Sequence, residues 1–167
     1  WDILRVAPEI LRRHADVRFV FGGVGESIVD EAEIRQYCRE SGIEHRLVFL
    51  GRIDGAEKIS TYLSSDVFLF PSREEIFPNS ILEALASGLP IISTRIFCIP
   101  EMVEEGVNGF LIEPGDLKAL KERLEALIAD TTLRQEMRTR NRRRAVEKYD
   151  VQVAVRKLRP ILSGKRP

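Results

Sequence analysis

The feature that most constrains the fold of this chain is a regular alternation of short apolar runs with longer amphipathic stretches. The runs are rich in branched and aromatic residues and lie at positions 17–21, 47–50, 67–70, 91–93 and 110–112. Short buried strands separated by helical patterns are typical of βαβ units, in which neighbouring strands run parallel. The alternation therefore predicts an α/β fold with a Rossmann-like open parallel sheet and helices on both faces.

The stretches between the runs show the helical period and predict eight helices. We expect them at 2–13, 30–41, 56–64, 79–87, 100–105, 117–129, 133–149 and 151–162. Pro8 lies inside the first of these, which predicts a kink or a late start. With 167 residues, of which 44% are hydrophobic, the chain is long enough for one domain with its own core.

The segment 71–90 carries the strongest functional signal. Pro78 suits the first turn of a helix and Gly88 followed by Pro90 suits its end. The free N–H groups of that helix would face the loop after the 67–70 strand, where open α/β sheets bind anions. We expect an anion, such as a diphosphate, to contact Phe77, Pro78, Asn79, Ser80 and Ile81.

Two glutamates flank this helix start. Glu75 lies in the preceding loop, and Glu83 lies roughly 7 Å along the helix at ~1.5 Å per residue. Each carboxylate can accept hydrogen bonds from a pair of vicinal hydroxyls. Two other interpretations remain open from the residues alone. The carboxylates are either ordinary solvated charges or an acid and nucleophile pair, which would have to lie ~5 to 9.5 Å apart.

These residues resemble the Glu-x7-Glu signature of the retaining group 1 glycosyltransferases. The resemblance runs from Pro71 to Ser93 and continues through the segments 99–103, 106–112 and 114–116, so that nearly the whole chain can be laid along the C-terminal domain of that family. The chain departs from the family at Ile76 and at Phe97-Cys98, where glycines are usual. Larger residues there are expected to reshape the pocket for the donor.

The resemblance implies an excised donor-binding domain, residues 1–167, of a two-domain enzyme of the GT-B architecture. Glu75 would be the catalytic residue that holds the donor sugar, Glu83 would hold the ribose, and the helix start would hold the diphosphate. The implied reaction transfers a hexosyl group with retention from GDP-mannose or a UDP-hexose, in the synthesis of a glycan, glycolipid or surface polysaccharide. A mannosyltransferase is one such enzyme.

The resemblance also implies that the chain needs partners outside itself. It implies no cofactor and no metal, and a glycan or lipid-linked acceptor bound by an N-terminal domain that this sequence lacks. An Arg and a Lys that hold the diphosphate in the family would also precede Trp1. We therefore expect the chain alone to fold but not to transfer sugar.

Weaker candidates lie at the ends of the first two strands. Gly23 and Gly25 form either a plain βα turn or a wall of the site. Arg52 and Ile53 match the family segment that meets the nucleotide base, on which Arg52 would stack unless it is a plain surface charge. Lys58 and Arg73 are lower-ranked neighbours of the phosphates.

Composition narrows the range of partners and compartments. The chain has 26 Lys plus Arg and 26 Asp plus Glu, which argues against a nucleic-acid partner. Two cysteines form no disulfide framework and fit a cytoplasmic protein. The arginine run at 138–144 predicts a solvated helix face paired with Glu136 and Glu147; the alternative is contact with an anionic membrane surface.

Two other classes of protein remain as alternatives to the transferase. One is a sugar-nucleotide epimerase of the same architecture, which would need a second acid/base set that the sequence does not show. The other is a non-enzymatic nucleotide-binding regulatory module of flavodoxin-like shape. Such a module would have no need for two glutamates around one helix start.

Overall fold

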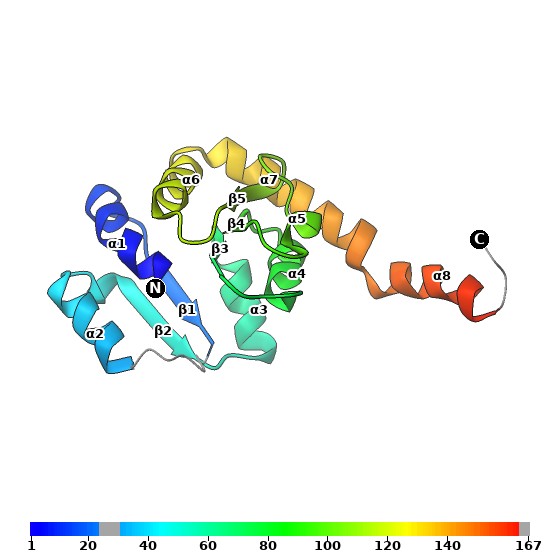
Figure 1. Cartoon of the computed structure of the whole chain (residues 1–167), viewed down its shortest axis with the longest axis horizontal. Coiled ribbons are helices and arrows are strands. Elements are labelled where there is room, and N and C mark those ends of the chain that lie inside the picture. Colours follow the sequence, from blue (N-terminus) through cyan, green and yellow to red (C-terminus); the bar gives the residue numbers. More distant parts are fainter. Residues whose placement is uncertain (24–30, 164–167) are drawn as a thin grey trace.

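The computed structural model describes residues 1–23 and 31–163, and five strands alternate with helices along them (Figure 1). The strands are β1 (Phe19–Gly22), β2 (Leu47–Gly51), β3 (Phe68–Phe70), β4 (Ile91–Thr94) and β5 (Gly109–Ile112). The α-helices are α1 (Asp2–Arg13), α2 (Glu31–Glu40), α3 (Gly55–Leu63), α4 (Asn79–Ala86), α5 (Ile99–Met102), α6 (Leu117–Ala129), α7 (Thr131–Arg144) and α8 (Val151–Leu162). A 3₁₀ turn, η1 (Glu44–Arg46), precedes β2, and a π-helical turn, η2 (Ala145–Tyr149), follows α7.

All strand pairs are parallel, which confirms the predicted α/β class. The hydrogen bonds divide the strands into two groups, however: β1 pairs with β2, and β3, β4 and β5 pair in that order. β1 and β3 are not hydrogen-bonded to each other, so the predicted single sheet is present as two parallel sheets. The two sheets nevertheless share one core, in which Phe19 of β1 lies in the same apolar cluster as Ile92 of β4.

Helices cover both faces of the three-stranded sheet. On one face Ile92, Phe110 and Ile112 pack in a cluster with residues of α1 and α6. On the other face Ile91 and Leu111 pack with residues of α4 and α5. Every residue of β4 and β5 is buried, because helices cover both faces of the sheet.

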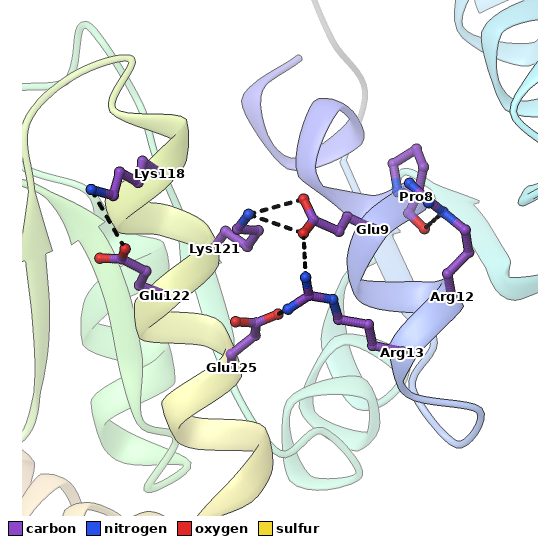
Figure 2. Close-up of polar contacts among 8 residues, drawn as sticks. All are labelled: Pro8, Glu9, Arg12, Arg13, Lys118, Lys121, Glu122 and Glu125. Carbon is purple, nitrogen blue, oxygen red and sulfur yellow. Dashed lines mark hydrogen bonds and ion pairs between the residues drawn. The ribbon is translucent and has the colours of Figure 1, made fainter.

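Helix α1 begins at Asp2 and contains Pro8, so the predicted late start is not seen. Leu4, Ala7 and Leu11 recur at helical spacing and are buried against the core. Two ion pairs join the outer side of α1 to α6: Glu9 with Lys121 and Arg13 with Glu125, both at 2.9 Å (Figure 2). The hydrogen bond from Lys121 lowers the pKa of the Glu9 carboxyl, although such exposed pairs add little stability.

The guanidinium of Arg46 fixes the approach to β1. It donates to the carbonyl oxygens of Leu11 at 2.6 Å, of Val17 at 2.7 and 3.1 Å, and of His14. These carbonyls belong to the end of α1 and the turn that follows it. One side chain from η1 therefore ties the end of α1 to the turn that leads into β1.

A buried amide holds α7 to the sheet. Asn141 is fully buried, and its Nδ2 donates to the carbonyl oxygen of Leu89 at 2.6 Å and to that of Asn108 at 2.8 Å. Leu89 lies in the turn between α4 and β4, and Asn108 lies in the loop between α5 and β5. Asn141 thus joins three separate parts of the chain.

The C-terminal region departs most from the predicted elements. The single helix expected at 133–149 is α7 followed by η2, and α5 ends at Met102 rather than at 105. Asp150, with φ −62° and ψ 136°, is extended and separates η2 from α8. Figure 1 shows α8 projecting beyond the rest of the chain, and Val151, Val155, Leu158 and Leu162 are exposed on it.

Candidate functional site

The N-terminus of α4 lies after the carboxyl end of β3 and is open. Pro78 is the N-cap residue, with φ −74° and ψ 111°, and no side chain caps the helix. The N–H of Ile81 donates to the carbonyl oxygen of Pro78 at 3.1 Å, and the side chain of Ile81 is buried. Among the described residues, the N–H groups of Asn79 and Ser80 have no backbone partner. Within the predicted set, these two residues therefore carry the donors that an anion would meet.

The loop that carries Glu75 is held to β4 by hydroxyl groups. Ser93 Oγ donates to the carbonyl oxygen of Phe70 at 2.8 Å, and Thr94 Oγ1 donates to that of Ser72 at 2.5 Å. Further along, the Cys98 thiol donates to the carbonyl oxygen of Ile76. The loop is therefore fixed to buried residues of β4 and, at Ile76, to Cys98 at the start of α5.

Glu75 itself lies half-buried on this loop. Over the residues that the structure describes, its carboxylate makes no hydrogen bond or ion pair. Arg73, a lower-ranked phosphate candidate, is instead paired with the buried Asp2 of α1 at 3.1 Å. The carboxylate of Glu75 is thus available to a ligand, whereas the guanidinium of Arg73 is already engaged.

Glu83 is held by two side chains of α3. Lys58 Nζ lies 2.7 Å from Glu83 Oε1, and Tyr62 Oη lies 3.1 Å from Glu83 Oε2. Burial, and then the charge and hydrogen bond of Glu83, raise the pKa of the Tyr62 phenol. Sequence reasoning missed this arrangement and placed Lys58 beside the phosphates. The spacing of Lys58 and Tyr62 puts both on one face of a helix, but it does not show which neighbour that face contacts.

The other predicted residues lie at the ends of β1 and β2. The N–H of Gly23 donates to the carbonyl oxygen of Gly51 at 2.7 Å, and Gly23 has a φ of 129°, which favours glycine. Ile53 abuts Gly22, where an added Cβ would lie 2.7 Å from Ile53 Cδ1. The side chain of Arg52 is exposed, and it forms no polar contact within the described part of the chain. Gly25 lies outside the described residues.

Three apolar side chains are exposed beside the α4 N-terminus. They are Ile76, Phe77 and Phe97, which are 75%, 51% and 68% exposed. The bond from Cys98 to Ile76 joins the two loops that carry them. Among the described residues, Phe97 is the one non-glycine residue with a positive φ, which is 44°. Ile76 and Phe97, which stand where glycines were expected from the resemblance, therefore add exposed apolar surface beside the α4 N-terminus.

Replacing Phe97 by glycine should stabilise the fold by about 0.5–1 kcal/mol. The left-handed conformation costs a non-glycine residue ~1–2 kcal/mol, and the greater freedom of glycine in the unfolded chain offsets part of that gain. Phe97→Ala is the matched control, because it removes the exposed ring but keeps the Cβ. Urea denaturation of both variants checks this; equal stabilities would show that the backbone at residue 97 is not strained.

The arginine run at 138–144 is largely engaged with the body of the domain. Arg140 pairs with Glu136 at 3.0 Å as predicted, but within residues 1–23 and 31–163 no pair involves Glu147. Four of the guanidinium groups donate to backbone carbonyl oxygens, namely those of Ser65, Ala86, Glu101 and Val107. Arg142 and Arg143 are exposed as predicted, but the pair with Glu147 is not seen among the described residues, and most of these arginines also satisfy carbonyl groups of neighbouring elements.

The described part of the chain offers neither a metal site nor a membrane span. It contains no group of three or more His, Cys, Asp or Glu side chains that could hold a metal ion. None of its helices combines the length and apolar character that a membrane crossing requires.

Residues 2–144 match the family model described as glycosyl transferases group 1. Sulfoquinovosyl transferase SQD2 of Arabidopsis thaliana is 38% identical over 67% of this chain and 22% of its own length. N-acetyl-alpha-D-glucosaminyl L-malate synthase of Bacillus anthracis is 33% identical over 89% of this chain and 37% of its own length. The chain thus spans well under half of the length of these curated relatives.

Two solved structures show the same fold. The C-terminal domain of a group 1 glycosyl transferase, LpcC of Francisella tularensis, matches with a TM-score of 0.80 and 27% identity, over 90% of this chain and 78% of that one. HepE of Anabaena, solved in complex with UDP, matches with a TM-score of 0.85 and 25% identity, over 98% of this chain and 46% of that one. The predicted fold is therefore confirmed.

Proposed function

The chain belongs to the group 1 glycosyl transferases, and on that premise we propose that the full-length protein transfers a hexosyl group from a UDP-hexose with retention of configuration. The proposal rests on one observation: an uncapped helix start with free N–H groups, at Asn79 and Ser80, lies between two carboxylates. The complexes of Anabaena HepE with UDP and with UDP-glucose support uracil as the base. The acceptor is a glycan or a lipid-linked sugar bound by another part of the protein.

The three parts of the donor are assigned to three parts of the site. The N–H groups and the positive end of the α4 dipole stabilise the diphosphate, which gains charge as the glycosidic bond breaks. Glu83 lies one helical turn after Asn79 and accepts hydrogen bonds from the ribose hydroxyls. Glu75 holds the hydroxyls of the donor sugar. No step in this scheme requires a proton transfer from these two carboxylates.

Replacing Glu83 by alanine should weaken binding of UDP by about 1.5–3 kcal/mol, because hydrogen bonds to a charged group are lost. UDP and UDP-hexose should lose affinity equally, since both carry the ribose. Calorimetric titration of the full-length protein with UDP, GDP, ADP and their sugars measures the effect and identifies the base.

The control for this experiment is Glu122→Ala. Glu122 is an exposed carboxylate on α6 whose only ion pair in the described part of the chain is a 3.9 Å contact with Lys118. Nucleotide affinity should be unchanged in this variant. If Glu83→Ala also leaves it unchanged, Glu83 does not hold the ribose.

A further inference from the structure

The carboxylate of Glu83 is oriented by two donors from α3, one on each oxygen. Lys58 and Tyr62 are one helical turn apart on α3, so both side chains reach across to the same residue of α4. Lys58 Nζ donates to Oε1 at 2.7 Å, and Tyr62 Oη donates to Oε2 at 3.1 Å. Two different donors on two different oxygens fix the rotation of the carboxylate plane as well as its position.

The environment of this cluster differs on its two sides. The ring of Tyr62 packs beside Phe68, with ring centroids 5.6 Å apart, and its hydroxyl also lies 3.4 Å from the carbonyl oxygen of Ser80. The side chain of Glu83 is 39% exposed and that of Lys58 is 36% exposed. A ligand can therefore reach the carboxylate from solvent while Tyr62 is anchored in the protein.

The hydrogen-bonding capacity of the carboxylate defines what such a ligand should be. A carboxylate has about four acceptor positions, two on each oxygen. Lys58 and Tyr62 occupy one position on each, so that Oε1 and Oε2 each retain capacity for a further donor. A pair of adjacent hydroxyls offers two donors at fixed spacing, which matches one remaining acceptor on each oxygen.

We propose that Lys58 and Tyr62 are positioning residues that make the site selective for a nucleotide whose ribose carries both hydroxyls. This inference rests on the proposed function, which assigns the ribose to Glu83. A carboxylate held by both α3 donors cannot rotate to bring its two oxygens to a single hydroxyl. A 2′-deoxyribose, which has lost one hydroxyl, therefore leaves one oxygen without a ligand donor. A carboxylate released from Lys58 or Tyr62 can rotate and discriminates less.

The test compares UDP with 2′-deoxy-UDP by calorimetric titration of the full-length protein and its variants. The native protein should prefer UDP by about tenfold, since a hydrogen bond to a charged group is lost in the deoxy compound. Tyr62→Phe removes one hydroxyl and keeps the ring, and Lys58→Met removes the charge and keeps most of the stem. In each variant the preference should fall to within about threefold. The same pair with guanine is used if GDP is the nucleotide that binds.

A control variant and thermal melting separate positioning from folding. Glu57→Gln alters an exposed carboxylate on the same helix, which makes no side-chain contact with Glu83, and should keep the native preference. Melting temperatures of all variants show whether the fold is retained. A merely structural role would weaken both nucleotides alike and leave their ratio unchanged.

The outcomes distinguish this inference from the proposed function. If Glu83→Gln abolishes the preference but Tyr62→Phe and Lys58→Met keep it, the inference is wrong and the proposed function stands. If Glu83→Gln leaves both affinity and preference unchanged, the assignment of the ribose fails and the inference fails with it. If Lys58→Met weakens UDP strongly but uridine not at all, Lys58 acts on the phosphates and is not a positioning residue.

Discussion

Replacement of Glu75 by alanine in the full-length protein should lower kcat by about a hundredfold or more, the cost typical of losing one preorganised polar group at a reacting centre. Glu75 is half-buried on a loop that Thr94 fixes through the carbonyl oxygen of Ser72. Within the described residues its carboxylate has no partner, so it is free to bind the donor sugar. Affinity for the sugar nucleotide should also fall. Affinity for bare UDP should be nearly intact, because UDP lacks the sugar.

The neighbouring carboxylate provides the control for this prediction. Glu74 is exposed on the same loop, and only its backbone N–H and carbonyl group interact with Ser72. Glu74→Ala should therefore keep kcat within a few-fold of the native value. An equal loss of affinity for UDP and UDP-hexose in Glu75→Ala would place Glu75 against the nucleotide and reverse the assignment of the two glutamates.

Replacement of Asn141 by alanine should destabilise the fold by about 2–4 kcal/mol. The carbonyl groups of Leu89 and Asn108 would lose the buried donor that they share, and each buried acceptor without a partner costs ~1–3 kcal/mol. Asn141→Asp should destabilise more, because a carboxylate would then face two carbonyl oxygens in a buried site. Urea denaturation at pH 7 measures both variants.

Arg143→Ala is the control on the same helix. Arg143 is exposed, and it makes no polar contact within the described residues, so its removal should change stability by less than about 0.5 kcal/mol. If Asn141→Asp proves as stable as the native protein, the amide of Asn141 does not hold α7 in the way that the structure indicates.

The periodic parts of the sequence predicted the fold well. The bounds of α1 and α6 and the approximate positions of all five strands follow from apolar spacing alone, because burial against the sheet imposes that spacing. The pairing of strands did not follow from it. Apolar runs show which segments are buried but not which neighbours they bond to, and so the division between β1–β2 and β3–β4–β5 was missed.

The candidate site was only partly predictable for a related reason. The helix start at Asn79 and the two glutamates lie close together in sequence. Pro78 and Gly88 indicate where that helix begins and ends. The contacts of Glu83 with Lys58 and Tyr62 depend on how α3 lies beside α4, which no local pattern specifies. The carbonyl acceptors of the α7 arginines were missed for the same reason, because they are distant in sequence.

The direction of helix α8 depends on the backbone angles of one extended residue, Asp150. At ~1.5 Å per residue the twelve residues of α8 form an arm roughly 18 Å long, joined to η2 through one residue. A swing of about 20° at that joint would carry Leu162 roughly 6 Å, more than half the diameter of a helix. Small torsional changes at Asp150 would therefore displace the exposed apolar side chains near the end of α8, Leu158 and Leu162, by several ångströms without any change in the sheet or the α4 N-terminus.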